Sequence, residues 1–263
     1  MRAIYARLAR VGGAVREESP ADRVRPDPSD SERMREINLL SSVPKIIRDV
    51  SARKANKEEN RRLALKFERE YFDGTREQGY GGYTYDGRWV AVAKKLVDLY
   101  RLRPGSRVLD IGCAKGFLIK DLLEVAPGVE AWGIDISRYA LAHAHPAVSG
   151  RLVRASCERL PFADDSFDLA LAINTVHNLE PDGCLAAVRE LQRVSPRAGF
   201  IQVDAYRTAE ERALFEDWML TAKTYLRPEE WRELLARAGY TGDYYWTILE
   251  VEPGATQAAS GTA

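Results

Sequence analysis

The sequence predicts an α/β fold in which a mostly parallel sheet carries helices on both faces. The first observation is the run RVLDIGCAKG at residues 107–116, an apolar, partly β-branched stretch that ends in a glycine-rich turn. The second is that apolar residues recur at helical spacing directly after this turn, in residues 117–125. The third is that strand-like and helix-like stretches keep alternating to residue 204. Strands joined by crossover helices run parallel, which predicts the sheet.

Each predicted element follows from this periodicity and from the turn residues beside it. A helix over residues 89–102 is expected to stop at Pro104 and Gly105, just before the first strand. Aromatic and β-branched residues at 244–251 predict the last strand. The elements expected between these are strand 107–111, helix 115–125, strand 130–134, helix 138–145, strands 152–155 and 167–174, helix 182–194, strand 200–204, and helices 209–221 and 228–238.

The glycine-rich turn has the features of a nucleoside-cofactor site. Gly112 and Gly116 lack a Cβ atom, so a ligand can approach the backbone while helix N–H groups point at its negative end. Asp135 closes the second strand, where its carboxylate can accept hydrogen bonds from both ribose hydroxyls. Together these residues predict a site for an adenosine-type cofactor.

Three later stretches narrow the interpretation: LPF at residues 160–162, DDSFDLAL at 164–171 and INTVHNL at 173–179. With them, residues from about 85 to 251 resemble the class I S-adenosylmethionine (SAM)-dependent methyltransferase family. The first motif of that family is usually acidic-x-Gly-x-Gly-x-Gly, and alanine often takes the middle place, as Ala114 does here. SAM is therefore favoured over NAD, whose glycines are spaced G-x-G-x-x-G. The resemblance implies a Rossmann-like, seven-stranded sheet with one antiparallel strand.

The resemblance also implies roles for residues at the ends of the strands. Asp110 would orient the methionyl amino group, Asp135 would hold the ribose, and the backbone of the turn would line the cofactor. Ser156 stands where the family often has an acidic residue that contacts adenine, so its hydroxyl or the next backbone N–H would read the base edge. The expected cofactor-binding residues are Asp110, Gly112, Cys113, Lys115, Gly116, Asp135, Ile136, Ser156, Cys157 and Asn174.

Lys115 breaks a local rule. A cation in the first turn of a helix faces the positive end of the helix dipole, which costs about 0.3–1 kcal/mol. Local rules tend to be broken at functional sites, so Lys115 is expected to answer an anion, either the cofactor carboxylate or an acidic substrate. The alternative is a long side chain that reaches out to water.

Methyl transfer needs an aligned nucleophile and, for a hydroxyl or an ammonium, a group that takes its proton. His177 is the one histidine expected in the crevice, beside Asn174, and an imidazole can take a proton at neutral pH. Packing or hydrogen bonding without catalysis is an equally weighted interpretation of His177. Asp204 is a second candidate base, with structural hydrogen bonding as its alternative. Tyr206 and Arg207 are candidates to hold a polar substrate.

The chain before the first strand is expected to form an appendage to the core fold. A short helix is predicted over residues 31–40, and a longer one from Pro44 towards Phe72. Tails of low apolar content are expected to be disordered. The predicted divisions are a tail at 1–30, a helical appendage and lid at 31–89, a SAM-binding domain at 90–252 and a second tail at 253–263.

Glycine and tyrosine crowd residues 71–89, which predicts a loop instead of regular structure. Such a loop before the core fold can act as a lid that excludes water from a reaction. Tyr80, Tyr83 and Arg88 are the candidates to cover cofactor and substrate, and Arg88 would pair with a carboxylate. Packing of the appendage onto the sheet is the alternative for any single tyrosine.

Composition limits the partners and the setting. Lys and Arg together number 39, as do Asp and Glu, so no net field would collect nucleic acid or an anionic membrane. Three scattered cysteines without a C-x-x-C pair argue against structural zinc and disulfides. A cytoplasmic location is expected, without a membrane span or a secretory signal. A homodimer through the N-terminal helices stays open.

The main hypothesis is a metal-independent, SAM-dependent methyltransferase that acts on O or N of a small, metabolite-like or sugar-like acceptor. An alternative enzyme of the same fold would cleave or cyclise the methionyl part of SAM and release methylthioadenosine. A third alternative is a SAM-binding partner without catalysis. The sequence does not identify the acceptor, because selectivity in such folds depends on the appendages.

Overall fold

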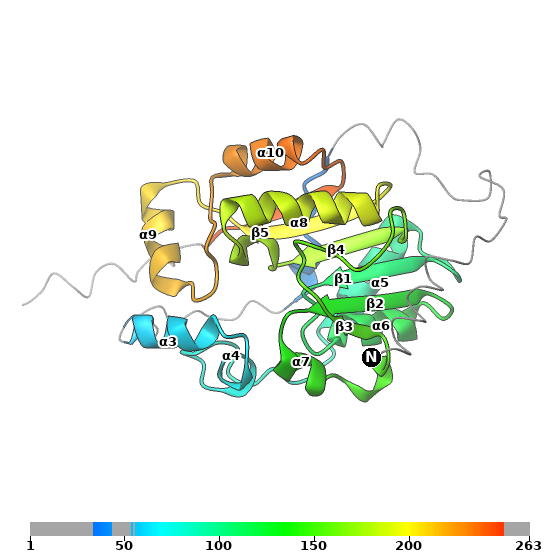
Figure 1. The fold of residues 1–263 in the computed structure, drawn as a ribbon, viewed down its shortest axis with the longest axis horizontal. Helices are drawn as coiled ribbons and strands as arrows, with labels where there is room; N and C mark the ends of the chain where they lie inside the picture. Colours follow the sequence, from blue (N-terminus) through cyan, green and yellow to red (C-terminus); the bar gives the residue numbers. More distant parts are fainter. Residues whose placement is uncertain (1–33, 44–53, 55, 250–263) are drawn as a thin grey trace, which may run out of the picture.

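The computed structural model describes residues 34–43, 54 and 56–249. In this part of the chain one sheet has six strands, in the spatial order β3-β2-β1-β4-β5-β6, and every neighbouring pair is parallel (Figure 1). The predicted α/β architecture is therefore confirmed. The strands are β1 (Arg107–Ile111), β2 (Glu130–Asp135), β3 (Leu152–Arg154), β4 (Leu169–Ile173), β5 (Gly199–Asp204) and β6 (Asp243–Thr247).

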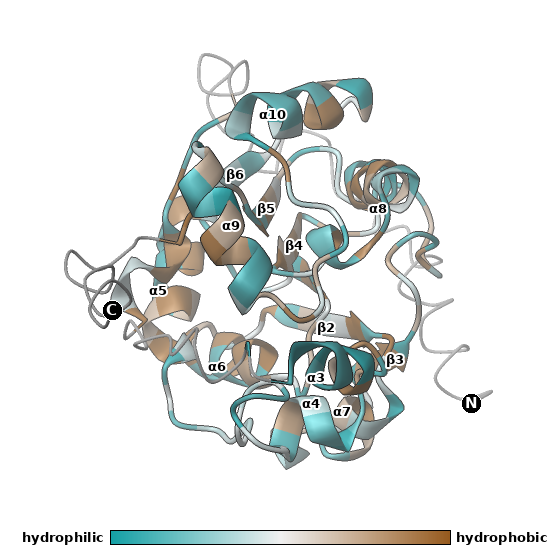
Figure 2. Ribbon diagram, turned by 90° about the vertical axis from the view of Figure 1, so that its left-hand side faces the viewer, coloured by the Kyte–Doolittle hydropathy of each residue, from teal (hydrophilic) through white to brown (hydrophobic). Residues whose placement is uncertain are grey.

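Helices pack against both faces of the sheet, and two apolar cores result. One core joins the sheet to α5 and α6, and the other joins it to α8 and α10 (Figure 2). Helix α6 begins two residues later than predicted, because Gly116 has a φ of 76° and forms its N-cap. The helices after the appendage are α5 (Trp89–Tyr100), α6 (Phe117–Val125), α7 (Arg138–Ala142), α8 (Pro181–Val194), α9 (Ala209–Trp218) and α10 (Pro228–Arg237).

The expectation of seven strands with an antiparallel last strand is wrong for the described residues. β6 pairs in parallel with β5, with Phe200 opposite Asp243. The chain returns to the sheet through α9 and α10, and a helical crossover brings a strand back in the same direction. The strand predicted at 244–251 is also shorter, and residue 250 onward lies outside the described residues.

The free edge of β6 is covered by the N-terminal segment. Tyr244 donates its N–H to Arg35 O, and Ile37 donates its N–H to Tyr244 O, at 3.0 and 2.8 Å. Arg35 also forms an ion pair with Asp243 at 2.8 Å. Part of the helix predicted at 31–40 is therefore extended, and only a 3-10 turn, η1 (Leu39–Ser42), packs against α5. Pairing with a sheet edge outweighed the weak local helix signal.

The longer helix predicted after Pro44 is interrupted. In the described residues it consists of α3 (Lys57–Ala64) and α4 (Arg69–Asp73), separated by Phe67, whose φ is 50°. This left-handed residue turns the chain so that Phe72 of α4 packs in one cluster with Ala114 and Ala140. The tails predicted at 1–30 and 253–263 lie outside the described residues.

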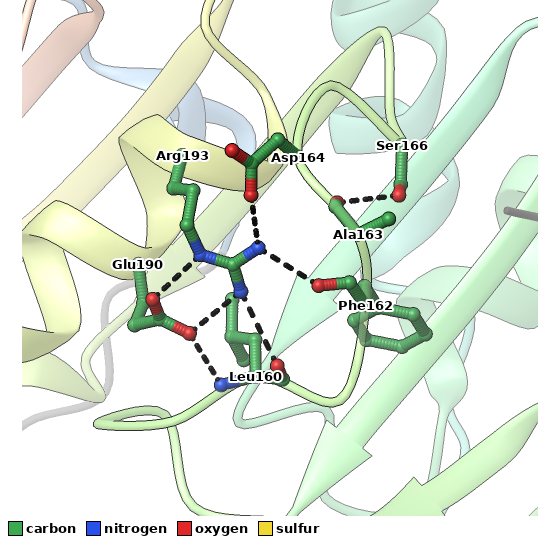
Figure 3. A network of polar contacts seen from close by, with 7 residues as sticks. All are labelled: Leu160, Phe162, Ala163, Asp164, Ser166, Glu190 and Arg193. Carbon is green, nitrogen blue, oxygen red and sulfur yellow. Dashed lines mark hydrogen bonds and ion pairs between the residues drawn. The ribbon is translucent and has the colours of Figure 1, made fainter.

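The stretch LPFADDSF is held by one arginine of α8 (Figure 3). Arg193 donates to the carbonyl oxygen of Phe162 at 2.8 Å and to that of Leu160 at 3.3 Å. The same guanidinium pairs with Asp164 and Glu190, and Glu190 accepts the backbone N–H of Leu160 at 2.7 Å. This motif therefore fixes the loop before β4 through backbone contacts.

Candidate functional site

The candidate site lies at the carboxyl edge of the sheet, where the strand order changes direction between β1 and β4. In an open α/β sheet the loops at this switch point diverge and leave a crevice. The turn after β1 is next to the end of β2 on one side and the end of β4 on the other. The predicted residues Asp110, Gly112, Asp135 and Asn174 therefore come from adjacent strand ends.

The turn after β1 requires a glycine at its first position. Gly112 has a φ of 84°, and a Cβ there would lie 2.0 Å from Oγ1 of Thr175, which follows β4. Thr175 is itself fixed, because its hydroxyl donates to Ile111 O at 3.0 Å. The N–H groups of Gly112 and Cys113 both donate to Ile134 O, at 2.8 and 2.9 Å. These two amides hold the turn against β2, a role that the sequence did not indicate.

Asp135 clamps the same turn. One carboxylate oxygen accepts the N–H of Ala114 and the other accepts the N–H of Ser137, each at 2.8 Å. Asp135 is buried, and burial raises the pKa of its carboxyl from the usual value, opposed by the backbone N–H groups. Ala114 stands in the left-handed region at a φ of 49°, which strains a residue with a Cβ.

Asp110 is a second buried carboxylate in the crevice. Burial, with the nearby Asp135 carboxylate as a lesser cause, raises the pKa of Asp110 to about 7. Burial and the Asp110 carboxylate likewise raise the pKa of the Tyr83 phenol. Lys115 of the turn donates to Tyr83 O at 2.9 Å, and this contact brings the aromatic segment to the turn after β1.

Tyr80 and Tyr83 lie side by side in the segment predicted to be a lid. Their ring centroids are 4.6 Å apart, and the Tyr83 ring stacks on Phe117 of α6 at 5.0 Å. Tyr80 is 39% exposed, and the neighbouring Tyr71 is the largest cause that raises the pKa of its hydroxyl. The guanidinium of Arg88 forms an ion pair with the nearby Asp86 at 2.6 Å.

Lys115 forms an ion pair with a carboxylate of its own chain, and not with a cofactor or a substrate. Its ammonium donates to both carboxylate oxygens of Asp73, at 2.7 and 2.8 Å, and to Tyr83 O at 2.9 Å. Asp73 also accepts the Tyr139 hydroxyl at 2.7 Å. Neither Asp73 nor Tyr139 belongs to a recognisable sequence motif, so their part in this contact was not predicted.

His177 and Asp204 meet across the ends of β4 and β5. The N–H of Asp204 donates to Nδ1 of His177 at 2.9 Å, and one Asp204 carboxylate oxygen is 3.5 Å from the same nitrogen. Burial lowers the pKa of His177, partly offset by Asp204. Asn174 is exposed at the end of β4 in the left-handed region, with a φ of 54°.

The other predicted residues have mixed placements. Ile136 is 54% exposed beside Asp135, which leaves an apolar surface at the crevice. Ser156 and Cys157 follow β3, and Ser156 accepts the N–H of Glu158 at 3.2 Å. Burial raises the pKa of Cys157 to about 12. The remaining two are engaged on the side of α9: the Tyr206 ring lies under the Arg212 guanidinium at 5.5 Å, and Arg207 pairs with Glu211.

The appendage contacts the protein on two sides of the carboxyl edge of the sheet. Figures 1 and 2 show α3 and α9 at the same end of the sheet. On one side Arg61 of α3 donates to Leu220 O at 3.0 Å and to Ala222 O at 3.1 Å, in the loop after α9. On the other side Asp73 binds Tyr139 of α7. The sequence did not indicate the contact of Arg61.

The described residues lack two features. No helix there is long and apolar enough to cross a membrane. No group of three or more His, Cys, Asp or Glu side chains in the same part of the chain could hold a metal ion.

Comparison with known proteins points to one domain family. The family model described as methyltransferase domain matches residues 108–199. A malonyl-[acyl-carrier protein] O-methyltransferase of Legionella pneumophila is 36% identical over 92 residues, which are 34% of this chain and 32% of that protein. An uncharacterized methyltransferase of Mycobacterium sp. (strain KMS) is 33% identical over 165 residues, 60% of either chain. The chain thus spans less than two thirds of these relatives.

One solved structure of similar kind is a SAM-bound amino pentose methyltransferase from Micromonospora echinaspora. Its TM-score to this chain is 0.36 at 24% sequence identity, over 41% of this chain and 46% of that chain.

Proposed function

We propose that this protein is a class I SAM-dependent methyltransferase that methylates O or N of a small-molecule acceptor without a metal ion, a proposal supported by the methyltransferase-domain match over residues 108–199. The observation that carries the acceptor class is the position of the appendage at the carboxyl edge of the sheet. Contacts of Arg61 on one side and of Asp73 on the other hold the appendage above the strand ends. A site roofed by its own chain favours a small acceptor over a folded macromolecule.

In this proposal SAM lies along the turn after β1. Asp135 uses its remaining lone pairs for the ribose, since each of its oxygens accepts only one of the two backbone N–H groups. Asp110 faces the cationic methionyl end, and Tyr83 covers that end through its stack on Phe117. Ile136, Ser156 and Cys157 would flank the adenine. SAM supplies the methyl group on a positively charged sulfur.

Transfer forms a bond from the acceptor O or N to the methyl carbon and breaks the bond from that carbon to sulfur, which keeps the electron pair. The acceptor proton must then leave. We assign its removal to the carboxylate of Asp204, because Nδ1 of His177 already accepts the backbone N–H. His177 thereby positions Asp204, and Asn174, exposed beside it, would orient the acceptor.

The lid assignment is part of the same proposal. Tyr80 and Tyr83 of residues 71–89 would exclude water from the sulfonium and the acceptor. Tyr206 follows β5 and is 8% exposed, and in this proposal its hydroxyl would contact the acceptor. Arg88 and Arg207 would reach a ligand carboxylate only after leaving Asp86 and Glu211.

Mass spectrometry of the nucleosides formed from SAM tests the function. Purified protein is incubated with SAM alone and with a pooled metabolite extract, beside the Asp135→Ala variant as a site control. We expect S-adenosylhomocysteine only with extract and only from the unaltered protein. Methylthioadenosine formed without extract would overturn the proposal in favour of cleavage of SAM. If the protein binds SAM tightly but forms no product, the proposal is overturned in favour of a SAM-binding protein without catalysis.

A further inference from the structure

Asp73 joins four parts of the site. Its carboxylate accepts the Lys115 ammonium on both oxygens, the Tyr139 hydroxyl on one, and the Tyr83 N–H on the other at 3.0 Å. These partners belong to the cofactor turn, to α7 and to the aromatic segment. Asp73 itself ends α4, so one carboxylate links the appendage to both sides of the turn.

The ion pair removes an unfavourable charge from the crevice. The Lys115 side chain is 8% exposed and lies one residue before Gly116, the N-cap of α6. The positive end of the helix dipole adds to the charge of the ammonium there. Within the described part of the chain, the Asp73 carboxylate and the Tyr83 carbonyl oxygen accept the hydrogen bonds of this ammonium. Without Asp73 a unit positive charge would remain beside the cofactor turn.

Such a charge would act on SAM and on its product in different ways. SAM carries a positive sulfur, whereas the sulfur of S-adenosylhomocysteine is neutral, and the two molecules are otherwise the same apart from the methyl group. An uncompensated cation in a partly buried site repels the positive sulfur of SAM but does not repel the neutral sulfur of S-adenosylhomocysteine. The ratio of the two affinities therefore reports charge, whereas a loss of shape would weaken both.

We propose that Asp73 is a positioning residue that neutralises Lys115, and that this pair sets the preference of the site for the sulfonium form of the cofactor. The inference rests on the proposed function, since it requires SAM in the crevice. It also assigns Lys115 a role through charge balance, without direct contact to the cofactor carboxylate.

Calorimetric titration of SAM and S-adenosylhomocysteine into the full chain tests the inference. Asp73→Asn should weaken SAM binding about tenfold at neutral pH and weaken binding of the product less than about threefold. Lys115→Met should shift the ratio the other way, towards SAM, because it leaves the negative charge of Asp73 without the opposite charge of Lys115. The double variant should return the ratio to within about twofold of the unaltered protein, since the two changes are coupled. Asp164→Asn, which breaks an ion pair with Arg193 elsewhere, is the matched control.

The outcomes separate this inference from the proposed function. If the unaltered protein binds neither ligand, both fail. If it binds both but Asp73→Asn weakens them equally or leaves them unchanged, only the charge role of Asp73 fails. If Asp73→Asn does not fold, Lys115→Met tests the inference by itself, because it should change the ratio of the two affinities in the opposite direction. An unchanged ratio in Lys115→Met also overturns the inference.

Discussion

The backbone N–H of Asp204 donates to Nδ1 of His177 at 2.9 Å. A nitrogen that accepts a hydrogen bond has no proton, so neutral His177 carries its hydrogen on Nε2. The ring is 4% exposed. His177 is therefore held as a neutral hydrogen-bonding group at the end of β4, and the role of a general base falls to its neighbour.

His177 should make stability depend on pH. Burial lowers its pKa in the folded protein, with a smaller opposing effect of Asp204. The unfolded chain then binds a proton below about pH 6.5 that the folded protein does not bind. The contribution of His177 to the free energy of unfolding is full above that pH. It is lost as the pH falls towards the pKa of His177 in the folded protein. Between pH 7.5 and 5.5 the unaltered protein should lose about 1 kcal/mol more stability than His177→Asn.

Urea unfolding at several pH values measures this difference. Asparagine keeps an acceptor near Nδ1 but does not titrate. His143→Asn is the control, because it makes the same replacement at an exposed residue after α7, away from the ends of β4 and β5. Equal slopes for the unaltered protein and His177→Asn would contradict the assignment of a neutral, buried ring.

Ala114→Gly should stabilise the protein. A φ of 49° costs a residue with a Cβ about 1 kcal/mol, and glycine adopts it without that strain. Ala91→Gly is the control of opposite sign, since Ala91 is exposed inside α5, where glycine costs about 0.5–1 kcal/mol. Thermal unfolding should raise the Tm of the first variant and lower that of the second. A lower Tm for both would contradict this expectation and would show that packing of the Ala114 methyl group against Phe72 outweighs the backbone strain.

Gly112→Ala should disrupt the cofactor turn. A Cβ at this position would lie 2.0 Å from Oγ1 of Thr175, in addition to the strain of a φ of 84°. Gly150→Ala is matched in conformation, with a φ of 74°, but nothing lies within 4 Å of its Cβ. Chemical denaturation should show Gly112→Ala to be less stable than Gly150→Ala by about 2 kcal/mol or more. Equal losses would mean that conformation alone, without the clash, explains the glycine.

Binding of SAM should weaken in acid through Asp110. Burial and Asp135 raise the pKa of Asp110 to about 7, so much of it is protonated in the empty site at neutral pH. A cationic ligand favours the ionised form, so binding should release a proton and should be about tenfold weaker at pH 6 than at pH 8. Calorimetry in buffers of different ionisation enthalpy measures both effects. Asp110→Asn should flatten the profile, whereas Asp98→Asn, on the exposed side of α5, should not.

Prediction from sequence succeeded where the signal was local. The strand before Gly112, the turn and the helix after it follow from side-chain period and from two glycines, which act over a few residues. The end of β2 at Asp135 was placed in the same way. The interrupted helix at Phe67 was not foreseen, because its turn is stabilised by packing of Phe72 on a distant cluster.

The direction of the last strand shows the same limit. Its aromatic, β-branched residues predicted a strand, and β6 is one. Its parallel pairing depends on the path through α9 and α10, and its covered edge depends on Arg35, far away in the chain. The alternation of side chains along β6 predicts neither its parallel pairing nor the cover of its edge.

The sequence by itself determined the order of strands and helices along the chain, the glycine turn after the first strand and the resemblance of the domain to a methyltransferase family. The reason is that backbone preferences and apolar period act between near neighbours. Only the tertiary structure decided which groups complete the site. Lys115 forms an ion pair with Asp73, 42 positions away in the chain. His177 accepts a hydrogen bond from the backbone N–H of Asp204 in the next strand. Such pairs form because packing of the sheet brings together buried polar groups that each need a partner.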